Sequence, residues 1–403
     1  MSAQWTAIED ALVTLLAEAR VTSTRLMSPL LSSLGKVLAS DIVAEQTVPP
    51  FDNSAMDGYA VRVADLLNGQ SVTVTQRIAA GSIGREVLPG EAARIFTGAA
   101  MPLGADAVLM QENAIIDGDQ LSTEQIIPQA NNVRRAGKDV AKGAIVFKAG
   151  HRLKPQDLGV LASIGLTELP IYAPLKVAVI STGDELREPG ETLQRGQIFN
   201  SNRYTLYGLI SSLGAEVVDL GICEDTPLAT EAILRKAADS SDLVISTGGV
   251  SVGEEDHVKS VVERLGELKL WKLAIKPGKP LAYGRVLGLP FIGLPGNPAS
   301  VFVTFNLVAR PYILSLQGAT DVTPVTVFVA AGFSTQSAGR RQEYLRARVV
   351  NIDGCSRVEI YSQQSSDVLT STSWANCLAI VPAGKIVSEG DIIEVMLFEG
   401  LLS

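Results

Sequence analysis

The chain has 403 residues, of which 46% are apolar, and its 43 acidic and 34 basic side chains give a formal net charge of −9. This length predicts roughly two to four domains, and an acidic chain without a basic block is poorly suited to bind nucleic acid. The three cysteines (Cys223, Cys355 and Cys377) form no CxxC pair, which argues against a zinc ribbon and a dithiol redox centre. Their odd number and wide spacing fit a reducing compartment better than a disulfide framework.

Residues 1–45 are predicted to be helical, because apolar residues recur at helical spacing from Trp5 to Leu16. Glu9 and Asp10 interrupt this apolar pattern, which is typical of an amphipathic helix and not of a signal peptide. The sequence offers no clean run of the roughly 20 uncharged apolar residues that a membrane span needs. We therefore expect a cytoplasmic protein with no membrane partner.

Residues 46–139 are predicted to form a small β-rich domain, because short β-branched runs alternate with Gly and Pro turn signals. Residues 140–175 contain a strand-like run and then a helix that begins near Pro155 and ends near Gly165. We group residues 1–45 with 140–175 as one N-terminal helical unit, into which the β-rich domain is inserted.

From residue 176 the pattern changes to nearly continuous apolar runs such as KVAVIST, DLVIST and LPFIG, as expected of strands buried on both faces. Helical segments alternate with these runs, which predicts a doubly wound parallel α/β domain over residues 176–320. Short alternating strands return in residues 321–403, which predicts an all-β C-terminal domain. The expected fold class is therefore multidomain α/β plus β.

Three polar segments follow predicted strands of the α/β domain, at residues 181–186, 246–256 and 294–300. In open α/β sheets, ligands bind beyond the carboxyl ends of the strands. The Gly248-Gly249 pair predicts a loop whose N–H groups face an anion, and Asn297-Pro298 predicts a helix N-terminus. Each loop alone is better explained by a turn that merely needs glycine or a cap, but the presence of both loops on one rim favours an anion site.

Carboxylates gather on the same rim. Together with the anion loops they suit Mg²⁺ held by protein oxygens and substrate phosphates, although a solvated acidic edge is an alternative for Glu254 and Glu255. The residues are Asp184, Glu185, Asp225, Glu254, Glu255 and Asp256.

Lys276 and Lys279 stand close together in the segment KPGKP. Two ammonium groups held this near repel each other, so a bridging oxyanion is favoured over a solvated turn. Residues 340–346 (RRQEYLR) fit either an oxyanion clamp or an exposed strand paired through Glu343. Residues 49–60 are polar yet include Phe, Met and Tyr, and a domain-linking turn explains them equally well.

Taken together, seven motifs resemble those of one family, the molybdopterin molybdenumtransferases or bacterial MoeA proteins, which are similar to the E domains of plant Cnx proteins and animal gephyrin. The resemblance covers essentially the whole chain, and the motifs occur in the family's order. They are PPFDNSAMDGYAVR (49–62), RIFTGAAMPLGADAV (94–108), VRRAGKDV (133–140), STGDEL (181–186), GGVSVGEEDH (248–257), KPGKP (276–280) and LPGNPAS (294–300).

This resemblance implies insertion of molybdate into adenylylated molybdopterin, with Mg²⁺-dependent release of AMP. The implied catalytic residues are Asp57, Thr97, Asp139, Glu185, Asp225 and Asp256, of which Glu185, Asp225 and Asp256 are also the implied Mg²⁺ ligands. The implied substrate-binding residues are Ser246, Gly248, Gly249, Ser251, Lys276, Lys279, Pro295, Asn297, Pro298, Ser300, Arg346 and Ser371.

The family also implies an elongated homodimer, in which residues 49–60 of one subunit face the α/β site of the other. The expected partners are the preceding adenylyltransferase and the molybdenum enzymes, or their chaperones, that receive the product. Two other functions stay open. The α/β domain alone resembles molybdopterin adenylyltransferases, although the extra domains argue against that step, and a scaffold role would depend on residues 320–403.

Overall fold

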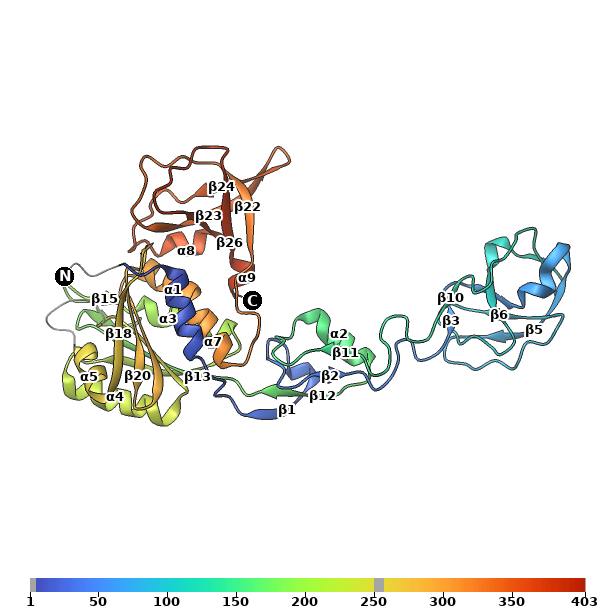
Figure 1. Ribbon diagram of the computed structural model, residues 1–403, viewed down its shortest axis with the longest axis horizontal. Coiled ribbons are helices and arrows are strands. Elements are labelled where there is room, and N and C mark those ends of the chain that lie inside the picture. Colours follow the sequence, from blue (N-terminus) through green and yellow to red (C-terminus); the bar gives the residue numbers. More distant parts are fainter. Residues whose placement is uncertain (1–4, 250–256, 403) are drawn as a thin grey trace.

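The computed structural model describes residues 5–249 and 257–402 and shows an elongated molecule (Figure 1). The α/β domain and the C-terminal β domain lie together at one end, and the β-rich inserted domain lies at the other. The N-terminal unit lies between them, and the chain passes through it once on the way out and once on the way back.

The α/β domain is built on a six-stranded sheet with the order β16-β13-β17-β21-β20-β18. The first four strands are parallel, as the sequence predicted, but β20 and β18 are antiparallel and extend one edge. Leu287 and Gly288, with φ of 51° and 87°, form the two-residue turn that joins β20 to β21, and such turns produce antiparallel hairpins. The strands are β13 (Lys176–Thr182), β16 (Glu216–Cys223), β17 (Leu243–Thr247), β18 (Gly266–Lys272), β20 (Pro280–Val286) and β21 (Leu289–Leu294).

Helices cover both faces of this sheet, because successive strand residues point to opposite sides. Val177 and Val179 of β13 pack in the core with α1, α3, α6 and α7, whereas Ala178 and Ile180 pack in the core with α4 and α5. The predicted doubly wound arrangement is therefore confirmed. The helices are α1 (Ile8–Glu18), α3 (Ser201–Ser212), α4 (Pro227–Ser240), α5 (His257–Leu265), α6 (Pro298–Thr304) and α7 (Arg310–Leu316).

The helix α1 differs from its predicted place. We grouped residues 1–45 with 140–175, but Ile8, Ala11 and Leu15 of α1 are buried in the core of the α/β domain. The helix also ends earlier than expected, at Glu18. The next residues include three β-branched side chains in VTST, which have low helix propensity.

The segment from Pro298 to Leu316 is one continuous helical stretch, in which a π-helical segment (Phe305–Ala309) joins α6 to α7. By length and composition this stretch alone, among the described residues, is apolar enough to cross a membrane. However, 94% of its most apolar 18-residue window is buried inside the molecule. It is therefore the core helix of the α/β domain. Its N-terminus directly follows the loop after β21, so the buried helix fixes the position of that loop.

The N-terminal unit consists of small antiparallel strand pairs and one helix around a separate core that includes Leu38, Leu161 and Ile171. The helix α2 begins at Pro155 and is followed by Gly165 with φ of 84°, as predicted. Its elements are β1 (Arg25–Pro29), β2 (Ile42–Val43), β11 (Ile145–Phe147), α2 (Pro155–Ser163) and β12 (Glu168–Tyr172).

The inserted domain is β-rich, as predicted, with a six-stranded sheet of order β7-β4-β6-β5-β9-β8. A short pair, β3 with β10, adjoins it where the two connecting segments enter and leave. The strands are β3 (Asn53–Ser54), β4 (Gly58–Val61), β5 (Val72–Ile78), β6 (Glu91–Ile95), β7 (Ala107–Met110), β8 (Ile115–Asp117), β9 (Gln120–Ser122) and β10 (Val133–Arg134).

The C-terminal domain is a closed β barrel, because β23 pairs with β24 on one side and with β25 on the other. A short strand of the α/β domain, β19 (Ile275–Lys276), pairs with the start of β23 and joins the two domains. The other elements are β22 (Thr326–Ala331), β23 (Gln342–Ile352), β24 (Cys355–Ile360), α8 (Thr370–Trp374), β25 (Cys377–Val381), β26 (Ile392–Leu397) and α9 (Phe398–Leu402).

Candidate functional site

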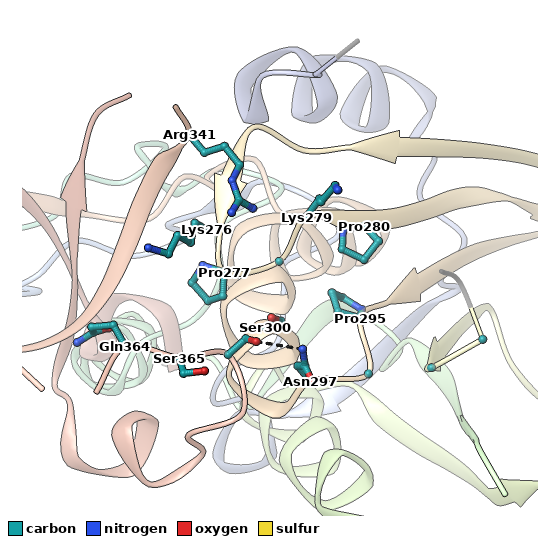
Figure 2. Close-up of a pocket in the computed structure, with 15 residues that line it drawn as sticks. Lys276, Pro277, Lys279, Pro280, Pro295, Asn297, Ser300, Arg341, Gln364 and Ser365 are labelled. Atoms are coloured by element: carbon teal, nitrogen blue, oxygen red, sulfur yellow. Dashed lines mark hydrogen bonds between the residues drawn. The ribbon is translucent and has the colours of Figure 1, made fainter. Parts of the chain in front are cut away.

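A cavity of about 560 Å³ lies where the carboxyl ends of β17 and β21 meet the C-terminal barrel (Figure 2). Three segments that the sequence singled out meet here: the glycine pair after β17, the loop after β21 and the lysine segment that follows β19. The lining residues are Gly248, Gly249, Lys276, Pro277, Gly278, Lys279, Pro280, Pro295, Gly296, Asn297, Ser300, Arg341, Gln364, Ser365 and Ser366.

The two glycines after β17 are required because both backbones are left-handed and there is no room for a side chain. Gly248 has φ of 86°, and a Cβ there would lie 2.5 Å from the Thr182 carbonyl oxygen. A Cβ on Gly249 would lie 2.6 Å from Cγ2 of Val258. We expected the N–H groups of this loop to face an anion, but the Gly248 N–H donates to the carbonyl of Leu294 at 3.3 Å. Gly248 therefore forms part of the cavity wall, but its N–H is already hydrogen-bonded to the neighbouring strand β21 and does not point to an anion.

The loop after β21 places Asn297 at the N-cap position of α6 and Pro298 at its first turn, as predicted. The Asn297 side chain does not cap the helix, because its Nδ2 donates to the Ser366 hydroxyl at 3.0 Å. The Ala299 N–H likewise donates to the Ser366 carbonyl at 3.0 Å. Ser366 of the C-terminal domain thus occupies one N–H of the helix end that we predicted to bind an anion, while Ser300 of the same helix still lines the cavity.

The two lysines of the KPGKP segment lie on the cavity wall but have different surroundings. Nζ of Lys276 lies 3.2 and 3.3 Å from the two carboxylate oxygens of Glu343. Lys279 forms no ion pair with an acidic side chain of residues 5–249 or 257–402. Gly278, with φ of 102°, turns the chain between them where a Cβ would lie 2.8 Å from Thr304.

The C-terminal barrel supplies further cavity residues, one from the segment 340–346 that the sequence left open between an oxyanion clamp and an exposed strand, and three that were not predicted. Arg341 adds a third cation, and its Nη1 donates to the carbonyl of Ile275 at 3.0 Å. Gln364, Ser365 and Ser366 form the opposite wall, and Figure 2 shows Gln364 and Ser365 across the cavity from Lys279. The only sequence signals were the arginines of residues 340–346 and the polar run QQSS at residues 363–366.

Arg346 and Ser371 were predicted to contact substrate, but both are fully buried and neither lines the cavity. Nε of Arg346 donates to the Ser371 hydroxyl at 3.0 Å, and its Nη2 donates to the Ser365 carbonyl at 2.9 Å. Burial lowers the pKa of the guanidinium to about 10. In this structure the pair therefore acts on the cavity indirectly, by holding the loop that contains Gln364 and Ser365.

Glu185 and Asp225 follow the carboxyl ends of neighbouring strands, since Thr182 of β13 pairs with Cys223 of β16. Neither lines the cavity, and the described residues contain no group of three or more His, Cys, Asp or Glu side chains suited to a metal. The predicted residues Ser251, Glu254, Glu255 and Asp256 lie outside the described residues. Glu185 and Asp225 carry carboxylate oxygens, which are the kind of donor that Mg²⁺ prefers.

Ser246, also predicted to bind substrate, lies inside β17 and is buried. Its Oγ has no hydrogen-bond partner among the described residues. Because it does not line the cavity, it belongs to the layer beneath the glycine loop.

Asp57 and Thr97, predicted as catalytic, lie together in the inserted domain. One carboxylate oxygen of Asp57 accepts from the Thr97 N–H at 2.8 Å and from its hydroxyl at 2.9 Å. These hydrogen bonds, first that of the backbone and then that of the hydroxyl, hold the pKa of Asp57 below its ordinary value, and Arg94 contributes in the same direction. Such a carboxylate stays ionised and has a fixed orientation.

Asp139 lies in the segment that leads back from the inserted domain, where its N–H donates to the carbonyl of Val48 at 2.9 Å. This segment runs between β10 and β11 and connects the inserted domain to the N-terminal unit. The inserted domain, which contains the Asp57–Thr97 pair, lies at the opposite end of the molecule from the α/β and C-terminal domains that form the cavity (Figure 1). The predicted site residues therefore form two separate groups in the monomer.

Comparison with protein families gives three matches along the chain. Residues 6–165 match the MoeA N-terminal region (domain I and II), residues 178–315 match a domain described as "Probable molybdopterin binding domain", and residues 329–398 match the MoeA C-terminal region (domain IV).

Curated relatives and solved structures agree with these matches. The chain is 41% identical to the molybdopterin molybdenumtransferase of Haemophilus influenzae, over 91% of this chain and 92% of that protein. It is 36% identical to that of a Nostoc species, over 90% and 86% of the two chains. The crystal structure of a molybdopterin biosynthesis MoeA protein from Pyrococcus horikoshii superposes with a TM-score of 0.85 at 30% identity, over 98% of this chain and 100% of that one.

Proposed function

The chain belongs to the MoeA family of molybdopterin molybdenumtransferases, and we propose that its cavity binds molybdate beside the phosphates of adenylylated molybdopterin. The protein is a transferase of molybdenum cofactor biosynthesis that acts by molybdate insertion. The steps that follow, including AMP release and the part played by Mg²⁺, are our proposal.

The observation that carries this proposal is the convergence of three cations from two domains on one cavity. Lys276 and Lys279 come from the α/β domain and Arg341 comes from the C-terminal barrel. Molybdate is a tetrahedral dianion, and a pyrophosphate linkage is also anionic, so ammonium and guanidinium groups are suitable partners for both. Gln364, Ser365 and Ser300 add neutral polar groups to the lining of the same cavity.

The position of each residue indicates the role that we propose for it. The lysines and Arg341 hold the oxyanions, while Arg346 and Ser371 fix the loop opposite them. Stabilisation of the charge that develops on the departing AMP phosphate is then electrostatic, since donors already in position need no reorganisation during the reaction.

Mg²⁺ is part of the proposal because the donors near the strand ends are oxygens. Glu185 and Asp225 would hold it, together with the predicted ligand Asp256. When bound there it would neutralise phosphate charge and favour loss of AMP.

We also propose that the active form is a homodimer in which the two groups of site residues come from different subunits. The support is geometric, because the inserted domain, which contains the Asp57–Thr97 pair, lies at the opposite end of the chain's structure from the two domains that form the cavity (Figure 1). A two-fold axis would give two identical shared sites. The expected partners are then a molybdopterin adenylyltransferase upstream and molybdenum enzymes, or their chaperones, downstream, all in the cytoplasm.

The experiment that tests the function is AMP release from adenylylated molybdopterin by the purified protein with Mg²⁺, with and without molybdate. We expect release that requires molybdate and a product that reconstitutes an apo molybdenum enzyme. ATP-dependent adenylylation of free molybdopterin, without such release, would instead assign the preceding step. Lys279→Gln should raise the molybdate concentration needed, with the fold intact.

A further inference from the structure

The indole of Trp5 lies against two of the three cavity cations. Nζ of Lys279 is 5.4 Å from the ring centroid, and Cζ of Arg341 is 5.5 Å from it. Both distances are within the range in which a cation is attracted to the face of an aromatic ring. One ring thus contacts a lysine of the α/β domain and an arginine of the C-terminal barrel, which lie near each other at one edge of the cavity (Figure 2).

The backbone next to Trp5 is fixed to the α/β domain. Thr6 donates its N–H to the Lys272 carbonyl at 2.9 Å and accepts from the Ala274 N–H at 2.8 Å. The side chain of Trp5 is itself half exposed, at 46%, so it contributes little to the core. Its fixed backbone and exposed ring indicate a role at the cavity edge and not in packing.

The indole of Trp5 offsets the repulsion between two neighbouring cations. Lys279 and Arg341 repel each other, and neither forms an ion pair with an acidic side chain in the described part of the chain. The negative face of the indole attracts both cations without neutralising them, so their charge remains available to an anion. A carboxylate in the same place would form an ion pair with the cation, as Glu343 does with Lys276, and would compete with an incoming anion.

We propose that Trp5 is a positioning residue that holds Lys279 and Arg341 side by side as one oxyanion-binding pair. This inference rests on the proposed function of the cavity and adds a residue to it. Trp5 acts through the two cations, so its loss should weaken oxyanion binding without removing any group that contacts the oxyanion.

Molybdate affinity, measured by calorimetry on the full-length protein, tests the proposal. We expect Trp5→Ala to raise the molybdate Kd by roughly five- to thirty-fold, given the usual strength of two exposed cation–π contacts. Trp5→Phe keeps an aromatic face and should restore most of the affinity. Trp374→Phe is the matched control, because Trp374 contacts Arg348 with a ring-centroid distance of 4.6 Å and does not line the cavity.

A spectroscopic readout separates positioning from a loss of folding. Molybdate should change the tryptophan emission of the wild type and of Trp374→Phe, and the change should be absent in Trp5→Phe. An unchanged Kd in Trp5→Ala, or an emission change that persists in Trp5→Phe, would overturn the proposal.

The same measurements distinguish this inference from the proposed function. If the wild type binds molybdate but releases no AMP, the proposed reaction is wrong while the comparison of Kd values still decides the role of Trp5. If molybdate-dependent AMP release occurs and Trp5→Ala binds molybdate normally, only the role of Trp5 is wrong. A wild type that binds no molybdate overturns both.

Discussion

Lys276 and Glu343 form an ion pair across the junction between the α/β domain and the C-terminal barrel, with Nζ 3.2 and 3.3 Å from the two carboxylate oxygens. The two residues lie opposite each other where β19 pairs with β23. The lysine that was predicted to bind an oxyanion is therefore held by an acidic side chain of the neighbouring domain, and an incoming oxyanion must compete with that carboxylate.

This competition gives the first prediction. Glu343→Gln should tighten molybdate binding by about two- to five-fold, because exposed ion pairs contribute up to about 1 kcal/mol. Glu389→Gln is the control, since Glu389 pairs with Arg357 at 3.6 Å on the barrel surface. Weaker binding in Glu343→Gln would mean that Glu343 orients Lys276 productively instead of competing for it.

The second prediction concerns the pKa of Asp57. Thr97→Ala removes the hydroxyl hydrogen bond and keeps the backbone one, so the pKa of Asp57 should rise towards its ordinary value. Because the folded pKa is depressed, the stabilisation is present at neutral pH and is lost as the pH falls through that pKa. The acid limb of the activity profile should therefore move to higher pH in Thr97→Ala.

NMR titration of the Asp57 carboxyl carbon measures this shift directly. Thr97→Ser keeps the hydroxyl and should restore the wild-type value. An Asp57 pKa that is the same in Thr97→Ala and the wild type would show that the backbone N–H alone sets it.

The third prediction concerns Mg²⁺. Asp225→Asn should raise the Mg²⁺ concentration for half-maximal AMP release by roughly ten-fold or more. The reason is that loss of even an outer-shell partner of a metal ligand lowers metal affinity or activity by about 10–100-fold. Asp184→Asn removes a neighbouring exposed charge from the same rim and should have little effect. An identical Mg²⁺ titration for Asp225→Asn and the wild type would remove Asp225 from the proposed ligands.

The fourth prediction separates buried from exposed site residues. Ser371→Ala leaves Nε of the buried Arg346 without its acceptor, which should lower the free energy of unfolding by about 1–3 kcal/mol. Lys279→Gln, on the cavity surface, should leave the free energy of unfolding nearly unchanged. Urea unfolding of both variants tests the contrast, and equal stabilities would contradict the buried role of Arg346.

The architecture could be predicted where local pattern determines structure. The apolar runs at β13, β17 and β21 identified the sheet, and Pro155 and Pro298 each marked a helix start. The hairpin between β20 and β21 was missed, because its turn is Leu287-Gly288 and lacks the usual Asn-Gly or Asp-Gly signal. The place of α1 was also missed, since an amphipathic pattern shows that a helix has an apolar face but not which core covers it.

The parts of the site that depend on local sequence could also be predicted. Glycine pairs, paired lysines and an Asn-Pro helix start show their chemistry locally, and all three meet at the cavity. Arg341 and Gln364 reach it only because the barrel docks on the α/β domain, which no local pattern reveals. The family resemblance implied a substrate contact for Arg346, whereas its burial and its hydrogen bond to Ser371 depend on tertiary packing.

The last prediction tests whether the two groups of site residues belong to different subunits. Asp57→Asn should disable the inserted-domain group, and Lys279→Gln should weaken molybdate binding by the cavity group. At a limiting molybdate concentration each homodimer should therefore be nearly inactive. In a purified mixed dimer with one subunit of each kind, one shared site contains both substitutions and the other contains neither. AMP release should then return to about half of the wild-type rate, because a two-fold dimer has two equivalent sites. If each site were built from a single chain, both sites of the mixed dimer would carry one substitution and the activity would stay as low as in the parent variants.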